Sequence, residues 1–481
     1  MVSQHTVEKI GGTSMSRFDE LLNTILVGER KGEDLYGRIF VVSAYSGITN
    51  ALLEHKKTGE AGVYGAFANG ARSDAWINKL EDCKALMLEE NLKIFVDNES
   101  LRVSADAFLI QRISFVRSAL ISLQELTSFG HFSLQEHLPK VREMLASIGE
   151  AHSAFNSTLR LKEQGVNAQF VDLTGWNDSD SAVNLDDLLT HIFSSINLET
   201  TLPIVTGYAH CKEGLMTTFD RGYSEMTFSR IACVTSAKEA IIHKEFHLSS
   251  ADPRIVGIER VYAIGKTNYD VADQLSNLGM EAIHPKAAAG LRKSGINLRI
   301  KNAFEPQHPG TLITLDYRSP TPCVEMVAGR ENLAGIEIFD QEMLGSSHHD
   351  LDINKLLHEL RLTVVSRDST ANSTTYFVDG SRKMVSRAVR LISERYPDAE
   401  VTLHNLSIVS AVGSDLKVAG ILAQTVQALA TSGINIQAIH QSVRQVEMQC
   451  FVRPADYEKA IRALHESLIE SQGYVGTIAA A

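Results

Sequence analysis

Two short apolar segments within the first 50 residues each lead directly into a turn of glycine and hydroxyl side chains. Residues 5–10 are followed by Gly-Gly-Thr-Ser at 11–14, and residues 38–44 by Ser-Gly-Ile-Thr-Asn at 46–50. Short β-branched runs of this kind are typical of strands buried in a parallel sheet. Ligands of open α/β sheets bind beyond the carboxyl ends of the strands. The two turns are therefore predicted to face one crevice.

Strand-like and helical segments alternate through the first two thirds of the chain. Further strands are expected at 167–173, 201–206 and 297–301, and helices at 18–27, 186–196 and 229–243. Strands that alternate with helices indicate layered α/β architecture. We expect a three-layer α/β/α domain with a mainly parallel sheet over residues 1–317.

The pattern changes after a proline-containing segment at 318–322. The last third reads as strand, helix, strand, strand, helix, which is the order of a ferredoxin-like fold short of one strand. We expect one such domain over residues 403–472 and a second, less regular copy over 323–402.

Composition and charge exclude several classes of protein. The chain has 46 Lys and Arg against 58 Asp and Glu, a net charge of −12, which argues against a nucleic-acid-binding surface. Five cysteines are scattered without close pairs, as suits a reducing compartment. The N-terminal segment has no apolar core of signal-peptide length, and no run approaches the roughly 20 apolar residues of a membrane span. We expect a cytoplasmic protein that binds neither nucleic acid nor membrane.

The first turn has the features of a phosphate site. Gly11 and Gly12 let backbone N–H groups approach a phosphate closely, and the start of the following helix adds partial positive charge. Lys9, at the end of the strand, can reach the same group. The alternative is a tight connection between a strand and a helix with an exposed lysine.

Two further positions carry charges suited to a small amino acid. Arg221 lies in a dense polar turn and can grip a carboxylate with two hydrogen bonds, and Glu150 can hold an ammonium group. Their ordinary interpretations are a surface salt bridge and an exposed acid at a helix start. His243 and His247 have the i,i+4 spacing of zinc ligands on a helix, but no third ligand is evident, so no metal site is predicted.

Taken together, these segments resemble the aspartate kinases, members of the amino acid kinase family. KIGGTS, VVSAYSGITN and GYAHCKEGLMTTFDRGYSE match the phosphate turn, the second turn and the segment with the substrate-binding arginine. SADPRIV, GMEAIHPKA and IKNAFEPQHPGTLI match three later signatures in family order. The segment at 409–442 resembles the second ACT domain, a small ligand-sensing module. The resemblance covers nearly the whole chain.

The resemblance implies transfer of the γ-phosphoryl group of ATP, with Mg²⁺, to the side-chain carboxylate of L-aspartate. The product is 4-phospho-L-aspartate, the first step toward lysine, threonine, methionine or ectoine. The implied catalytic residues are Lys9, which neutralises the transferring group, and Glu225, which orients Lys9. The implied aspartate pocket consists of Ser43, Thr49, Glu150, Tyr208, Arg221 and Ser224. The implied nucleotide side consists of Gly11, Gly12, Ser14, Lys244, Ser250, Asp252, Arg254 and Glu281.

We also expect a homodimer joined through the ACT region, because the edges of the ferredoxin-like sheet around residues 406–452 need covering and side-by-side pairing of two ACT sheets covers them. An amino-acid effector is expected at the ACT interface. In this family the second ACT unit is commonly inserted into the first. A strand at 473–478 would then complete the first unit.

Several positions depart from the family pattern. Glu225 stands where the family usually has Asp, Ser249 replaces a nucleotide-stacking tyrosine, and MLGSSHHDLDI at 343–353 replaces the usual effector loop. Lys244 replaces an acid and Glu281 a lysine, so we expect them to form a charge-swapped pair beside the nucleotide. These changes resemble the specialised aspartate kinases associated with ectoine synthesis.

Two other functions stay open from the sequence. A non-catalytic amino-acid sensor with ACT domains could have kept the kinase fold, which Lys244, Ser249 and Glu281 favour. An amino acid kinase for another acid, such as glutamate, would be revealed by turnover of that acid and not of aspartate.

Overall fold

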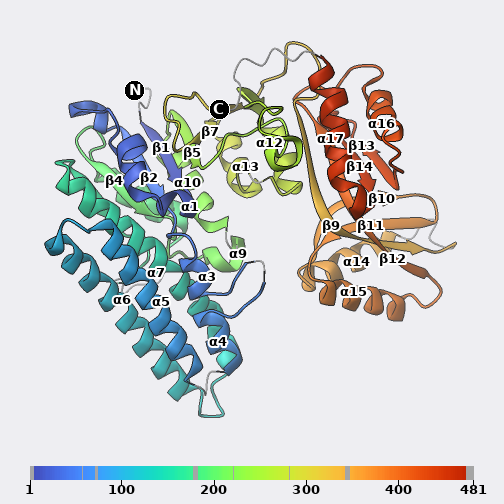
Figure 1. Ribbon diagram of the computed structural model, residues 1–481. Coiled ribbons are helices and arrows are strands. Elements are labelled where there is room, and N and C mark those ends of the chain that lie inside the picture. Colours follow the sequence, from blue (N-terminus) through green and yellow to red (C-terminus); the bar gives the residue numbers. More distant parts are fainter. Residues whose placement is uncertain are drawn as a thin grey trace. The chain divides into compact units, whose positions relative to one another are not determined.

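The computed structural model describes residues 5–56, 58–70, 74–176, 183–219, 222–280, 282–341 and 347–472. Its contacts divide the chain into two compact units (Figure 1). Unit 1 comprises the described residues of Met1–His247 and His284–Leu315, and unit 2 those of Leu248–Ile283 and Asp316–Ala481. The segment 248–283, expected within the first domain, thus clusters with the C-terminal part.

Unit 1 is built on a mainly parallel sheet, as expected. Its strands are β1 (Thr6–Ile10), β2 (Arg38–Val42), β3 (Ala168–Val171), β4 (Leu202–Thr206), β5 (Glu239–Lys244), β7 (Asn297–Asn302) and β8 (Thr311–Thr314). They lie in the order β3-β4-β2-β1-β5-β7-β8, and only the pairing of β7 with β8 is antiparallel. The carboxyl ends of β1, β2, β4 and β5 therefore share one edge of the sheet.

The expected helix over residues 229–243 is wrong in its second half, where the structure has strand β5. Helix α10 (Tyr223–Val234) ends early, and β5 pairs with β1 on one side and β7 on the other. Its middle residues, Ala240 to Ile242, are all buried. A short apolar run buried on both faces has no period that separates a strand from a buried helix, so the sequence pattern does not distinguish the two.

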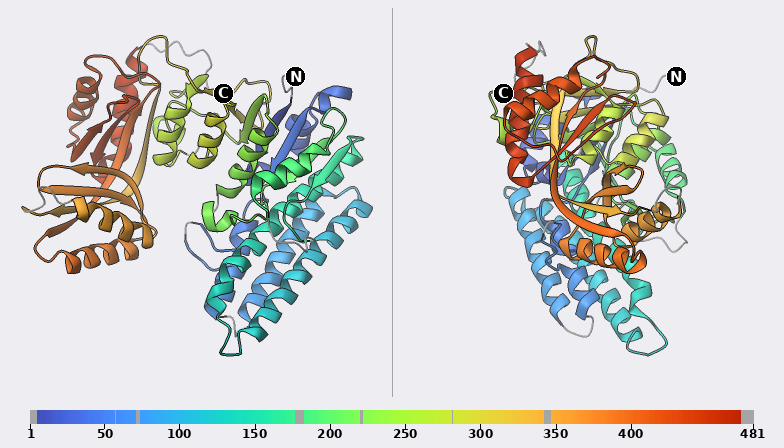
Figure 2. Two further views of the ribbon diagram at one scale, coloured as in Figure 1. Left: turned by 180° about the vertical axis from the view of Figure 1, so that it is seen from behind. Right: turned by 90° about the vertical axis from the view of Figure 1, so that its right-hand side faces the viewer.

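The helices of unit 1 pack on this sheet and beside one another. Three long helices, α5 (Ala75–Ile94), α6 (Glu99–Leu126) and α7 (Leu134–Glu163), lie side by side (Figures 1 and 2), and α7 also contacts β3 and β4. Besides α10, the shorter ones are α1 (Gly12–Met15), α2 (Phe18–Leu21), α3 (Ile48–Leu52), α4 (Val63–Gly70), α8 (Leu185–Ser194), α9 (Leu215–Phe219) and α13 (Pro285–Lys293). The helix expected at 18–27 is α2 followed by a π-helical turn at Leu22–Leu26. Among the described residues, no helix is both long and apolar enough to cross a membrane.

Unit 2 contains the expected ferredoxin-like architecture. Its antiparallel sheet has the order β10-β11-β9-β12-β14-β13. The strands are β9 (Met326–Phe339), β10 (Thr363–Ser369), β11 (Ser373–Asp379), β12 (Glu400–Val412), β13 (Ala438–Gln441) and β14 (Glu447–Val452). The long strands β9 and β12 pair along their whole length, so each serves both halves of the sheet (Figure 1).

Each half of this sheet is covered by its own pair of helices. Helices α14 (Ser347–Glu359) and α15 (Arg382–Arg395) share a core with β9 and β11. Helices α16 (Ile421–Thr431) and α17 (Tyr457–Leu468) share a second core with β12 and β14. The segment 248–264, which contains the short helix α11 (Pro253–Val256), contributes residues to this second core. Helix α12 (Tyr269–Asn277) packs in a third core with β9, β12 and β14. The strand expected at 473–478 lies outside the described residues.

Candidate active site

The turns after β1 and β2 touch each other, as the sequence indicates. A Cβ atom on Gly12 would lie 2.6 Å from the carbonyl oxygen of Ala44, so this position has room only for glycine. The backbone N–H of Ser46 donates to Ser16 Oγ at 2.8 Å, which ties the two turns together. Helix α1 is a single turn, so the backbone N–H groups of the turn, more than a helix dipole, would attract a phosphate.

A cavity of about 330 Å³ opens between these turns and helices α7 and α10. It brings together five predicted site residues, Gly12, Ser43, Thr49, Glu150 and Ser224. The remaining lining residues are Thr13, Ala44, Tyr45, Ser46, Gly47, Lys56 and Tyr223. The lining therefore combines hydroxyl groups, one carboxylate, one lysine and the backbone of two turns, around a space that could hold a small polar ligand.

Glu150 is the one acidic residue among those that line this cavity, which also include Lys56. It lies in the middle of α7 and is 1% exposed, so it is not an exposed acid at a helix start. Its Oε1 accepts a hydrogen bond from Ser224 Oγ at 2.6 Å, whereas its buried Oε2 has no hydrogen-bond partner among the described residues. Burial raises the pKa of Glu150 to about 8, against the opposing effects of the Ser224 hydroxyl and the Lys9 charge. A buried acceptor without a donor is costly, and a cationic ligand would satisfy it.

Lys9 and Glu225 form an ion pair at the carboxyl end of β1. Lys9 Nζ lies 3.5 Å from Glu225 Oε1, and the backbone N–H of His284 donates to Glu225 Oε2. Burial alone would raise the pKa of Glu225, but the charges of Lys9 and Lys244 and the His284 N–H together lower it. Glu225 therefore stays ionised and holds the ammonium group of Lys9 near Gly11, where an added Cβ atom would lie 4.0 Å from Nζ.

Tyr208 lines a different cavity from the other predicted substrate residues that the structure describes. Its hydroxyl donates to Glu143 Oε2 at 2.8 Å, and both residues line a space of about 290 Å³ with Trp176 and His210. The sequence did not single out Glu143, which is buried on α7 seven residues before Glu150. Two helical turns separate these acids, so the spacing alone places them on the same face of α7.

The residues predicted for the nucleotide side fall in both units. In unit 1, Ser14 is buried and its hydroxyl donates to Glu245 Oε1 at 2.7 Å, a partner that the sequence did not indicate. In unit 2, Asp252 caps α11 by accepting from the backbone N–H of Arg254 at 2.9 Å. The side chain of Arg254 is 87% exposed.

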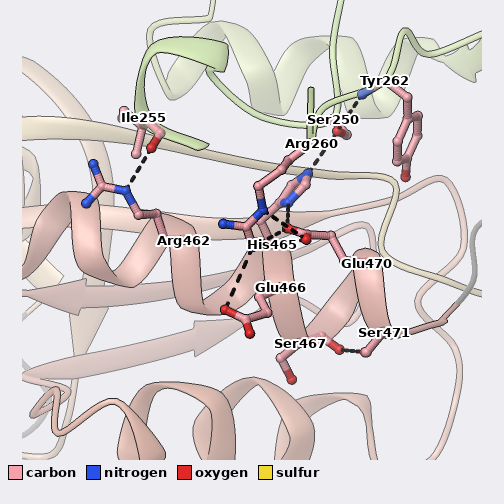
Figure 3. A network of polar contacts seen from close by, with 10 residues as sticks. All are labelled: Ser250, Ile255, Arg260, Tyr262, Arg462, His465, Glu466, Ser467, Glu470 and Ser471. Atoms are coloured by element: carbon pink, nitrogen blue, oxygen red, sulfur yellow. Dashed lines mark hydrogen bonds and ion pairs between the residues drawn. The ribbon is translucent and has the colours of Figure 1, made fainter. Parts of the chain in front are cut away.

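Three more residues remain from the predicted set: Ser250 and Glu281 of the nucleotide side and Arg221 of the aspartate pocket. Ser250 is fully buried in unit 2, where its hydroxyl meets His465 (Figure 3). Arg221 and Glu281 lie outside the described residues, and so does the predicted pairing of Glu281 with Lys244.

The two histidines with apparent zinc-ligand spacing do not share a helix. His243 lies in β5, and its Nε2 is 2.7 Å from Glu8 Oε2. His247 follows the strand, and its Nε2 is 2.9 Å from Glu305 Oε2. Each imidazole therefore has a carboxylate partner of its own.

Comparison with known proteins identifies the family. The chain matches the amino acid kinase family over residues 4–302 and an ACT domain over residues 409–468. It is 60% identical to the aspartate kinase Ask_Ect of Stutzerimonas stutzeri over 477 residues, 99% of this chain and 100% of that protein. It is 25% identical to the chloroplastic aspartokinase 1 of Arabidopsis thaliana over 97% of this chain and 80% of that protein.

A solved structure shows the same fold over nearly the whole length. Aspartokinase III of E. coli, in complex with aspartate and ADP, superposes with a TM-score of 0.72 at 21% identity, covering 96% of this chain and 99% of that one. The match to the amino acid kinase family covers unit 1 and also residues 248–283, which cluster with unit 2, whereas the ACT match lies wholly in unit 2. The chain belongs to the amino acid kinase family and carries an ACT domain in its C-terminal part.

Proposed function

We propose that the protein is an aspartate kinase, which transfers the γ-phosphoryl group of ATP to the side-chain carboxylate of L-aspartate and forms 4-phospho-L-aspartate. The observation that carries this proposal is Glu150 Oε2, which has no partner among the described residues and is buried in a cavity that also contains the glycine turn. A buried carboxylate with one free oxygen suits the ammonium group of an amino acid. The 60% identity to an aspartate kinase over the full chain supports the same substrate.

Different residues of unit 1 would bind the two substrates, aspartate and ATP. Glu150 would bind the ammonium group of aspartate, while the hydroxyls of Ser43, Thr49 and Ser224 line the same cavity. Arg221 would bind the α-carboxylate. The backbone N–H groups of Gly11 and Gly12 would receive the phosphates of ATP, with Ser14 beside them.

The chemistry asks for positioning and charge neutralisation more than for covalent participation of the protein. An oxygen of the substrate carboxylate attacks the γ-phosphorus, the bond from the γ-phosphorus to the bridging oxygen breaks, and ADP leaves with the electron pair. No proton has to move, because the nucleophile is already an anion. Lys9 would neutralise the transferring group, and Glu225 would hold Lys9 in place. ATP enters as its Mg²⁺ complex, so the ion is part of the substrate.

A coupled assay of ADP formation with L-aspartate, ATP and Mg²⁺ tests the proposal. Turnover of aspartate is the expected result. Turnover of glutamate in place of aspartate would reassign the substrate. Binding of either acid without ADP formation would identify a sensor that kept the kinase fold.

We propose further that the active protein is a cytoplasmic homodimer joined through the second ACT domain. Apolar side chains are exposed on and just before α16, and on and just after the edge strand β13: Val418, Leu422, Val426, Ile439 and Val443 are between 38% and 97% exposed. A strand at the sheet edge beside exposed apolar residues favours pairing with another sheet, and a second copy of this chain offers the same surface. All five cysteines are free, which suits a reducing compartment. An amino-acid effector would bind at the ACT interface.

A further inference from the structure

The cavity that contains Glu150 also contains a cation that the sequence did not single out. Lys56 lines this cavity from the loop between helices α3 and α4, and it is exposed. Its ammonium group has no ion-pair partner among the residues that the structure describes. By contrast, Lys9 Nζ lies 3.5 Å from a carboxylate oxygen of Glu225. Lys56 is therefore a basic group that is available to a ligand.

The loop that carries Lys56 is anchored to two helices of unit 1. The backbone N–H of Lys56 donates to Asn50 Oδ1 of α3 at 3.3 Å. Two residues before Lys56, Glu54 accepts two hydrogen bonds from Arg142 of α7, at 2.8 and 2.6 Å. Glu54 also forms a β-bridge with Ala61, which closes the loop. These contacts hold the loop against α3 and α7.

The same two helices provide the part of the cavity proposed for aspartate. Thr49 lies on α3 and Glu150 on α7, and both line the cavity together with Lys56. The glycine turn proposed for the phosphates instead follows strand β1. Because its anchors come from the two helices, Lys56 belongs with the groups proposed for aspartate rather than with those proposed for ATP.

Lys56 and Glu150 do not pair with each other. Glu150 Oε2 has no hydrogen-bond partner among the described residues, and the ammonium group of Lys56 likewise has none there. An acid and a base that line one cavity without meeting are complementary to a ligand that carries both signs of charge. An ammonium group would satisfy Glu150 and a carboxylate would satisfy Lys56, whereas a ligand of one sign would leave one of them unpaired.

We infer that Lys56 binds a carboxylate of the amino-acid substrate whose ammonium group binds to Glu150. The inference rests on the proposed function, in which aspartate occupies this cavity, and it adds a substrate-binding residue to that function. Aspartate has two carboxylates, so Lys56 and Arg221 would not compete for a single group. An amino acid with an uncharged side chain offers these two cations only one carboxylate, so Lys56 also favours an acidic substrate.

Substitutions of Lys56 test its charge. In Lys56→Met, KM and Kd for aspartate should rise about three- to tenfold, a modest effect because water screens an exposed lysine. Lys56→Arg keeps the charge, so both constants should stay within about twofold of those of the unmodified chain. KM for ATP should change by less than about twofold in either variant. Lys79→Met is the matched control: it removes the same charge beside the same loop, where Lys79 Nζ lies 3.9 Å from Glu60 Oε1, and should leave both substrates unaffected.

Amide analogues test whether the group bound by Lys56 is a carboxylate. Asparagine lacks the charge of the side-chain carboxylate, and isoasparagine lacks that of the α-carboxylate. In calorimetric titrations, Lys56→Met should weaken the binding of aspartate but not that of the analogue in which the paired carboxylate is an amide. Equal losses for aspartate and both analogues, or a loss for ATP alone, would overturn the inference.

Binding and turnover distinguish this inference from the proposed function. If aspartate is turned over and neither its KM nor its Kd changes in Lys56→Met, the inference fails and the proposed function stands. If no ADP forms but aspartate binds, and binds more weakly to Lys56→Met, the proposed function fails and the role of Lys56 stands. Absence of aspartate binding to the unmodified chain would overturn both. Circular dichroism of each variant checks that the fold is retained.

Discussion

Glu150 and Ser224 lie 74 residues apart in the sequence, yet the serine hydroxyl donates to Glu150 Oε1 at 2.6 Å. The two residues come from the middle of α7 and the start of α10, and the bond orients the carboxylate so that its other oxygen has no partner among the described residues. Gly207 makes this arrangement possible, because a Cβ there would lie 2.8 Å from Oε2. Glu150 is thus a buried carboxylate that lacks a hydrogen-bond donor at Oε2, as expected where a bound ligand supplies that donor.

This arrangement predicts a pH dependence of aspartate binding. The pKa of Glu150 in the free enzyme is about 8, and only the ionised form attracts an ammonium group. KM for aspartate should therefore fall by about tenfold for each pH unit from 6 toward 8 and then level off. Glu150→Gln should raise KM at pH 8 and abolish this dependence. Steady-state kinetics across this range, with ATP saturating, provide the measurement; a profile that is flat in the unmodified enzyme would contradict the assignment of Glu150.

Lys9→Met should reduce kcat by about 10²–10³ while leaving the fold intact. Its ammonium group is held by Glu225 at 3.5 Å and would act on the charge of the transferring phosphoryl group. Turnover and circular dichroism should be measured on the same sample. Lys212→Met, at an exposed position, is a control that removes the same charge away from the site. A Lys9→Met variant with near-native kcat would show that Lys9 does not neutralise the transferring phosphoryl group.

Arg221→Ala should raise KM for aspartate more than KM for ATP. A lost charge-assisted hydrogen bond is worth roughly 1.5–3 kcal/mol, or about ten- to a hundredfold in binding. Initial rates with each substrate varied in turn provide the comparison. If only KM for ATP changed, the α-carboxylate of aspartate would have to bind to a residue other than Arg221.

The parts of the fold that can be predicted from the sequence are those set by local patterns. The strands at 5–10 and 38–44 have β-branched runs that end in glycine turns, and both occur with bounds that differ by no more than two residues. Strand β5 escapes prediction because its apolar run has no distinguishing period. Local signals of this kind decide whether an element exists, but a fully buried strand at the sheet centre carries few of them.

The partners within the site cannot be predicted in the same way. Glu143 holds the Tyr208 hydroxyl and Glu245 the Ser14 hydroxyl, across 65 and 231 residues. The bond between Ser250 and His465 spans 215 residues. Such pairs depend on side-chain directions fixed only after the elements pack, so residue identity indicates the chemistry and not the contact. Tyr208 shows the consequence, since its side chain turns to Glu143 and away from the cavity of Glu150.

The exposed apolar residues of α16 predict how the proposed dimer can be dissociated. Leu422→Asp combined with Val426→Asp would place two charges in the proposed interface and should shift the protein to monomers in size-exclusion chromatography with light scattering. Gln427→Asp adds one charge on a different side of the same helix and should leave the dimer intact. A double variant that stays dimeric would move the interface away from α16.

Lys244 and Glu281 predict a coupled effect on ATP use. The charge of Lys244 already helps to lower the pKa of Glu225, which places Lys244 near the ion pair of Lys9 and Glu225. Both positions reverse the sign that the family pattern has, in opposite directions, so together they would keep the nucleotide side neutral. At about 4 Å and an effective dielectric constant near 20, a unit pair interacts by about 4 kcal/mol before desolvation, so reversing one charge should be felt. Lys244→Asp and Glu281→Lys should each raise KM for ATP, and the double variant should recover most of the loss. Additive effects would show that the two charges do not meet, and that Lys244 acts on the nucleotide through Glu225 and Lys9 instead.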